Sequence, residues 1–99
     1  MQNKSATVIE QLKQHREQLL AGLPVAHLFV FGSIARGEGT DTSDVDIIVE
    51  FSEPATFRPF MELKDRLELL LGMRVDLVTR NALRSSMRAQ IEKELIQVA

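Results

Sequence analysis

The chain has 99 residues, of which 44% are hydrophobic and 26% charged, with a formal net charge of -2 and no cysteine. This length and balance predict a single globular domain over residues 1–99. The slight negative charge argues against direct binding of nucleic acid, which needs a basic surface, and the lack of cysteine excludes disulfides and thiolate metal sites. No apolar run approaches the roughly 20 residues that span a bilayer, and the charged start does not resemble a signal peptide, so we expect a cytoplasmic protein with no membrane partner.

The first half of the chain predicts a helix followed by two strands. Residues 5–20 place their apolar side chains on one helical face. Residues 25–31 form a short apolar run suited to a buried strand, which stops abruptly at Gly32-Ser33 and continues into a short helix. After a polar loop, residues 44–51 predict the second strand.

The second half predicts a helix, a third strand and a final helix. Pro54 and Thr56 introduce the first of these helices, and Gly72 fits its end. Residues 74–78 read as a brief strand, and apolar residues at every fourth position predict a helix from about residue 82 to the end. This alternation of helices and strands predicts an α/β (or α+β) fold, with a small mixed sheet of about three or four strands flanked by helices.

Three carboxylates lie in otherwise apolar strands: Asp44, Asp46 and Asp76. Residues two apart on a strand share a face, so Asp44 and Asp46 should project together, and Asp76 could join them if its strand is a neighbour. Like charges held this close repel unless a cation lies between them, and Mg²⁺ prefers carboxylate oxygen. An Asp-x-Asp pair alone is more often part of a turn, and a lone strand aspartate more often an edge residue. The occurrence of all three in strands favours a metal site with catalytic function.

A candidate anion site precedes these carboxylates. A strand that passes through Gly32 into a short helix can direct backbone N–H groups at an anion, and the Ser33 hydroxyl adds a donor. Arg36 lies one turn further on, where it could meet a phosphate oxygen. Taken alone, Gly32-Ser33 would be read as an ordinary turn with Ser33 as the N-cap. Together with the carboxylates, the pattern predicts phosphoryl or nucleotidyl transfer.

Two segments resemble a known family. Residues 29–37 (Phe-Val-Phe-Gly-Ser-Ile-Ala-Arg-Gly) and 43–49 (Ser-Asp-Val-Asp-Ile-Ile-Val) are similar to the signature of the DNA polymerase β-like nucleotidyltransferases, and in particular to the minimal nucleotidyltransferase branch. Val75-Asp76-Leu77-Val78 occupies the place of that superfamily's third acidic strand. The resemblance implies the nucleotidyltransferase fold over nearly the whole chain.

The resemblance also implies a function. Many members of this branch are antitoxins encoded beside a HEPN-type ribonuclease toxin, which they neutralise by moving AMP from ATP to a toxin tyrosine in the presence of Mg²⁺. It implies that Gly32 and Ser33 hold the triphosphate, that Asp44 and Asp46 bind the metal, with two ions expected, and that Asp76 completes the acidic triad. The expected assembly is a hetero-oligomer with the toxin.

Two alternatives stay open at this point. The protein could neutralise a partner by stoichiometric binding without catalysis, or it could adenylylate a small molecule, as aminoglycoside-modifying relatives do, if a homodimer shaped the pocket. Arg80, Arg84 and Arg88 recur every four residues and predict one face of the final helix, more readily solvated than bound to a partner. An exposed Phe57 would be a candidate interface anchor.

Overall fold

The computed structural model describes residues 4–40, 42–54, 56–83 and 85–99. The helices are α1 (Lys4–Gln14), α2 (Arg16–Leu20), α3 (Gly32–Ala35), α4 (Phe57–Leu71) and α5 (Ser85–Glu94), together with the 3₁₀ helix η1 (Arg80–Ala82). The strands are β1 (Val25–Phe31), β2 (Val45–Phe51), β3 (Val75–Thr79) and β4 (Ile96–Gln97). None of the helices in these ranges is long and apolar enough to cross a membrane.

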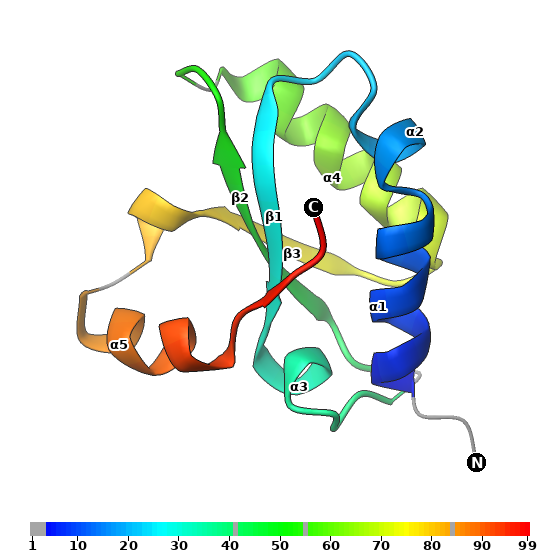
Figure 1. The fold of residues 1–99 in the computed structure, drawn as a ribbon, viewed down its shortest axis with the longest axis vertical. Helices are drawn as coiled ribbons and strands as arrows, with labels where there is room; N and C mark the ends of the chain where they lie inside the picture. The colour runs from blue at the N-terminus through cyan, green and yellow to red at the C-terminus, as the bar shows by residue number, and fades with distance from the viewer. Residues whose placement is uncertain (1–3, 41, 55, 84) are drawn as a thin grey trace.

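The four strands form one mixed sheet in the order β3-β2-β1-β4. β1 pairs antiparallel with both β2 and β4, whereas β2 and β3 are parallel. Two adjacent parallel strands require a crossover between them, and α4 provides it. The predicted mixed sheet of three or four strands flanked by helices is therefore confirmed (Figure 1).

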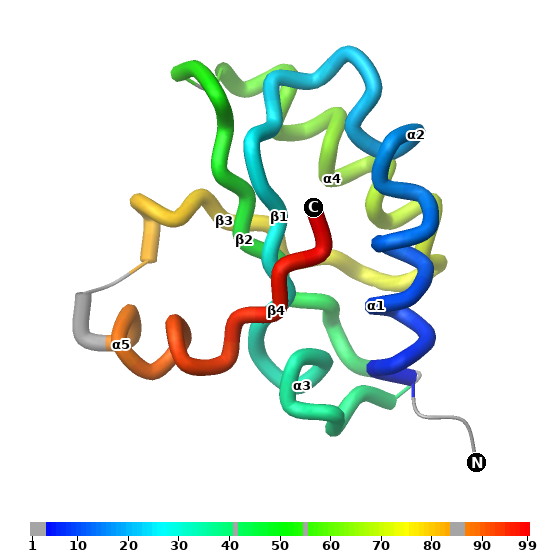
Figure 2. The backbone as a smooth tube through the Cα atoms, viewed as in Figure 1, coloured from blue at the N-terminus to red at the C-terminus, as the bar shows by residue number. Residues whose placement is uncertain are grey.

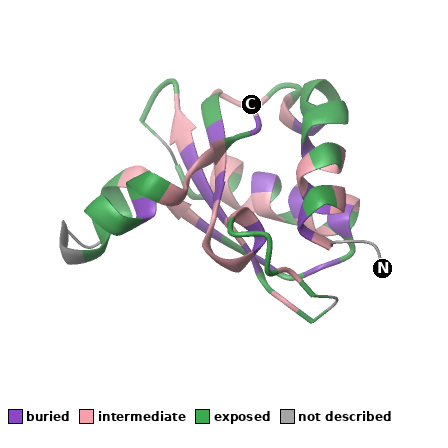
Figure 3. Ribbon diagram, turned by 60° about the horizontal axis from the view of Figure 1, so that its bottom comes forward, coloured by how far each residue is buried: buried purple, intermediate pink, exposed green. Residues whose placement is uncertain are grey.

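The main core lies between the sheet and the helices on one of its faces. In Figure 1, α1 and α4 lie on one side of the sheet and α5 on the other. Alternate residues of β2 supply the core, because their side chains point to the same face. The burial colouring of Figure 3 shows this core in purple. Its fully buried members include Val8, Leu12, Leu28, Val30, Val45, Ile47, Val49, Leu63 and Leu67.

The predicted helix over residues 5–20 is two helices. The chain leaves helical geometry at His15, whose φ of -105° and ψ of 12° separate α1 from α2. Ser5 lies buried in the first turn of α1, where its hydroxyl accepts a hydrogen bond from the backbone N–H of Gly39 at 2.9 Å. This contact fastens the polar loop before β2 to α1.

The predicted final helix from residue 82 to the end is wrong at both ends. α5 spans Ser85–Glu94, and the chain then extends into β4, which pairs with Phe29 and Val30 near the end of β1. Figure 2 follows this turn of the backbone from α5 past β1 to the C-terminus. Arg80 lies in η1 rather than on a face of α5, so the predicted three-arginine face does not form, and Arg84 falls outside the described residues.

Replacement of Leu67 by alanine should lower the free energy of unfolding by about 2–5 kcal/mol, since this α4 side chain is fully buried in the core. Leu69→Ala, two positions on in the same helix, removes a side chain that is 87% exposed and should cost less than about 0.5 kcal/mol. Urea denaturation of both variants checks this. Equal losses would show that α4 does not pack on the sheet as described.

Candidate functional site

Asp46 and Asp76 lie side by side on neighbouring strands. The two residues are direct partners in the parallel register of β2 and β3. Asp44 lies in the loop, one residue before β2 begins at Val45, and not in the strand itself as predicted. Its charge nevertheless acts on Asp46. The structure therefore pairs Asp46 with Asp76 at the start of the two strands, and Asp44 is near enough for its charge to act on Asp46.

Crowding at this point raises the pKa of Asp46 above its ordinary value of 3.8. Burial is the largest cause, followed by the charges of Asp76 and then Asp44, while Arg36 opposes the shift. The ionised form of Asp46 is thus held in an unfavourable environment by its neighbours. A cation between these carboxylates would relieve that repulsion.

Gly32 lies against this cluster because it has no side chain. Its φ of +71° is in the left-handed region, and a Cβ at this position would overlap a carboxylate oxygen of Asp46. Phe31, the preceding residue, is the register partner of Asp46 across β1 and β2. Close approach and backbone conformation both require glycine here.

Ser33 lies in the first turn of α3, directly after Gly32. The first N–H groups of a helix have no acceptor within the helix, so the backbone at Gly32 and Ser33 presents donors beside the carboxylates. The candidate anion site at the end of β1 thus lies beside the carboxylates near the start of β2, as the sequence predicts. α3 has only four residues, so its macrodipole adds little.

Arg36 forms two ion pairs that sequence reasoning did not anticipate. Its Nε pairs with Glu38, and one terminal nitrogen lies 3.3 Å from Glu94 of α5. The hydrogen bond to Glu38 raises the pKa of Arg36 most, and the charges of Glu38 and Glu94 add to it against an opposing effect of desolvation. No sequence signal links Arg36 to Glu94, because 58 positions separate them.

A small cavity of about 170 Å³ lies between α3 and α5, directly beside Gly32. Its lining residues are Phe31, Gly32, Arg36, Met87, Gln90, Ile91 and Glu94. One wall is apolar, and Arg36 and Glu94 form a charged edge. α5 therefore borders the region where the carboxylates and the Gly32-Ser33 segment meet.

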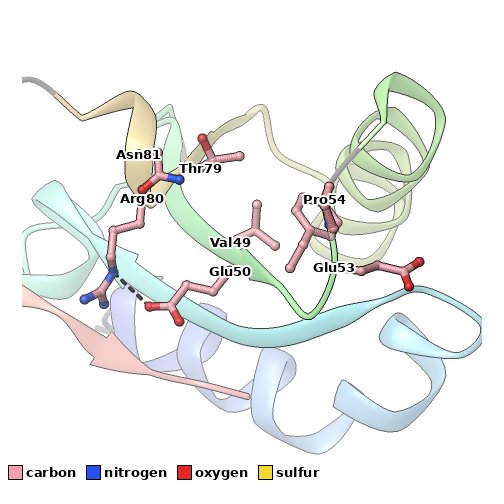
Figure 4. A pocket seen from close by; sticks show the side chains of 8 residues that line it. Val49, Glu50, Glu53, Pro54, Thr79, Arg80 and Asn81 are labelled. Atoms are coloured by element: carbon pink, nitrogen blue, oxygen red, sulfur yellow. Dashed lines mark ion pairs between the residues drawn. The ribbon is translucent and has the colours of Figure 1, made fainter.

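A larger cavity of about 490 Å³ lies at the other end of β2 and β3 (Figure 4). Arg80 borders it, with Nε 2.8 Å from Glu50 and a terminal nitrogen 3.1 Å from Glu92 of α5. The guanidinium also lies 4.9 Å from the centre of the Phe29 ring. Glu50 is thus engaged at the end of its strand, as expected. The lining of this cavity includes none of the three aspartates, so it is not the predicted site despite its size.

The donor set fits a magnesium ion. Within the described ranges, no three His, Asp or Glu side chains are grouped closely enough to enclose a metal ion by themselves. Mg²⁺ does not require such a cage, since it usually takes one or two carboxylates and completes its shell with water and substrate phosphates. Asp46, crowded by Asp76 and Asp44, and the bare backbone of Gly32 beside it match that chemistry.

The chain is similar to known proteins over most of its length. Residues 9–98 match the family model described as a nucleotidyltransferase domain. The chain is 41% identical over 87 residues to protein adenylyltransferase MntA of Thermococcus cleftensis, a match that covers 88% of each chain.

Solved structures with the same fold agree. A candidate minimal nucleotidyltransferase superposes with a TM-score of 0.74 at 40% identity, over 89% of this chain and 93% of that one. A toxin–antitoxin complex solved with AMP-PNP gives a TM-score of 0.71 at 24% identity, over 88% of this chain and 72% of that one. At the identity of the second structure, the similarity shows the shared fold alone.

Gly32→Ala should destabilise the protein more than Gly22→Ala. Both glycines have positive φ, +71° and +77°, so both alanines carry a backbone strain of roughly 1–2 kcal/mol. Only at position 32 would the added methyl group also meet the Asp46 carboxylate, whereas nothing lies within 4 Å at position 22. Urea denaturation measures the difference, and equal losses would contradict the close approach.

Asp46→Asn should raise the melting temperature of the metal-free protein at pH 7. Because the pKa of Asp46 is higher in the folded than in the unfolded state, the folded state loses stability as pH rises through these pKa values. The advantage of the asparagine variant should therefore be full at neutral pH and vanish about one unit below 3.8, which thermal scans in EDTA would show. A variant less stable than wild type at pH 7 would contradict this account.

Proposed function

Because this chain belongs to the minimal branch of the nucleotidyltransferase domain family, we propose that it transfers AMP from ATP to a tyrosine of a HEPN-type toxin and so acts as an antitoxin. The pairing of Asp46 with Asp76 beside the bare backbone of Gly32 carries this proposal. The adenylyltransferase name of the Thermococcus relative supports the reaction. The toxin–antitoxin complex with AMP-PNP supports ATP as the substrate and a toxin as the partner.

The residues take the following roles in the proposed reaction. The backbone at Gly32 approaches the triphosphate closely, and the Ser33 hydroxyl donates a hydrogen bond to a phosphate oxygen. Arg36 supplies the positive charge on the same side. Asp44 and Asp46 would hold Mg²⁺, with Asp76 completing the set.

Mg²⁺ bound there, as two ions, would neutralise the triphosphate and lower the pKa of the attacking hydroxyl. The acceptor oxygen forms a bond to the α-phosphorus while the bond from that phosphorus to the bridging oxygen breaks. Pyrophosphate leaves with the bonding electrons. The phenolic proton passes to the carboxylate of Asp76, which is more exposed than its register partner Asp46. The tyrosine hydroxyl has an ordinary pKa of about 10, so it needs this help at neutral pH.

If the acceptor is a tyrosine, it lies outside these 99 residues. These 99 residues contain no tyrosine, so transfer to a tyrosine within this stretch is impossible. Phe57, at the start of α4, is 79% exposed. We therefore propose it as an anchor for the partner. We propose that the reaction takes place in the cytoplasm, where ATP is available.

The test is transfer to the protein encoded by the neighbouring gene, which the proposal expects to be of the HEPN type. With ATP and Mg²⁺, intact-mass spectrometry should show the mass of AMP added to the partner. Asp76→Asn should lower the rate at least about 100-fold, because it removes a ligand and the proton acceptor together. Asp65→Asn, an exposed aspartate on α4, is the matched control and should leave the rate unchanged.

The same mixture separates catalysis from stoichiometric inhibition. An asparagine double variant at Asp44 and Asp46 that binds the partner but does not neutralise it would support the enzyme. Full neutralisation by that variant, with no mass added by the wild type, would overturn the proposal in favour of a binding antitoxin.

A further inference from the structure

Arg36 is the one cation, among the described groups, that acts on the Asp46 carboxylate. Negative charge surrounds this contact, because Asp44 and Asp76 also act on Asp46, and Glu38 and Glu94 pair directly with Arg36. A nucleoside triphosphate would add several further negative charges. The availability of the Arg36 guanidinium therefore matters for nucleotide affinity.

Glu94 reaches this guanidinium from α5, at the far end of the sequence. Both of its carboxylate oxygens lie near one terminal nitrogen of Arg36, at 3.3 and 3.4 Å. The Glu94 side chain is 19% exposed, against 47% for Arg36, so the carboxylate is the better shielded partner. Shielding from water reduces the screening of this pair by salt.

Glu38 and Glu94 bind different nitrogens of the Arg36 guanidinium. Glu38 accepts from Nε and Glu94 accepts from a terminal nitrogen, and both Arg36 and Glu94 line the cavity beside Gly32. Bidentate binding of a phosphate needs two adjacent N–H groups of the guanidinium fork, drawn from Nε and the terminal nitrogens. Both carboxylate contacts therefore compete with a phosphate for the same donors.

We propose that Glu94 competes with the nucleotide's phosphates for Arg36, so that nucleotide binding exchanges the Arg36–Glu94 pair for an Arg36–phosphate contact. This inference rests on the proposed nucleotidyltransferase function and names a residue outside its motif that sets nucleotide affinity. Glu94 is a positioning residue in this account, since it acts through Arg36. The exchange also removes the ion pair that ties α3 to α5.

A matched glutamate exists on the same helix. Glu92 lies two positions before Glu94 and pairs with Arg80 instead, at 3.1 Å, near the cavity at the other end of the strands. Glu92→Gln removes the same charge from α5 without touching Arg36. It separates the local competition from the general effect of one fewer negative charge.

The test is the affinity for Mg²⁺–ATP, measured by titration calorimetry at fixed salt. Glu94→Gln should tighten binding by about 2- to 5-fold, the range expected for releasing one partly exposed ion pair. Glu92→Gln should change it by less than about 2-fold. In the transfer assay, Glu94→Gln should lower the KM for ATP and leave kcat nearly unchanged.

A double-variant cycle shows whether Arg36 carries the effect. In an Arg36→Gln background, Glu94→Gln should no longer tighten binding. Glu94→Ala serves as a second removal of the carboxylate if the glutamine variant does not fold. Unchanged or weaker binding by the Glu94 variants, or an equal gain in the Arg36→Gln background, would overturn the inference.

Measurements on the wild-type protein distinguish a failure of the Glu94 inference from a failure of the proposed nucleotidyltransferase function. If the wild type binds Mg²⁺–ATP and transfers AMP, but Glu94→Gln binds no tighter, only the role of Glu94 fails. If the wild type binds no nucleotide, the nucleotidyltransferase proposal fails and the inference falls with it.

Discussion

Repulsion among carboxylates at the start of β2 is the constraint on which the site depends. The parallel register sets Asp46 beside Asp76, and the chain enters β2 through Asp44. The residue beside Asp46 is Gly32, and Asp46 lies too close for any side chain at position 32. A fold that concentrates unpaired negative charge in this way gives up some stability, which a bound cation would restore. Such a trade is expected where function, and not stability, selects the residues.

The rest of the fold supplies a rigid support for this point. One face of the sheet packs on α1 and α4, which fixes β1 and β2 and therefore the separation of Gly32 from Asp46. The other face carries the carboxylates and is only partly covered by α5. Ion pairs link α5 to that face at two places, through Arg36 and through Arg80. Exposed and partly exposed ion pairs are weak, so α5 is held less firmly than the helices of the core.

Local patterns predicted the strands and the motif, while distant contacts were beyond them. Short apolar runs and the abrupt stop at Gly32 identified β1 and β2, because these signals lie within a few residues. The helix expected to run to the end failed because Ile96 pairs with Val30, and a pairing so far apart in sequence leaves no periodic trace. The ion pair between Arg36 and Glu94 could not be predicted for the same reason. Asp76 could be placed beside Asp46 only by assuming that their strands were neighbours.

The central claim is that the carboxylates form a nucleotide site only together with a divalent cation. The most direct measurement is calorimetric titration of the protein with ATP, once with Mg²⁺ and once with EDTA. Three aspartates, with Arg36 already paired to Glu38 and Glu94, should repel a free triphosphate. The account predicts binding with Mg²⁺ and no measurable binding in EDTA. Equal affinity under the two conditions would contradict it.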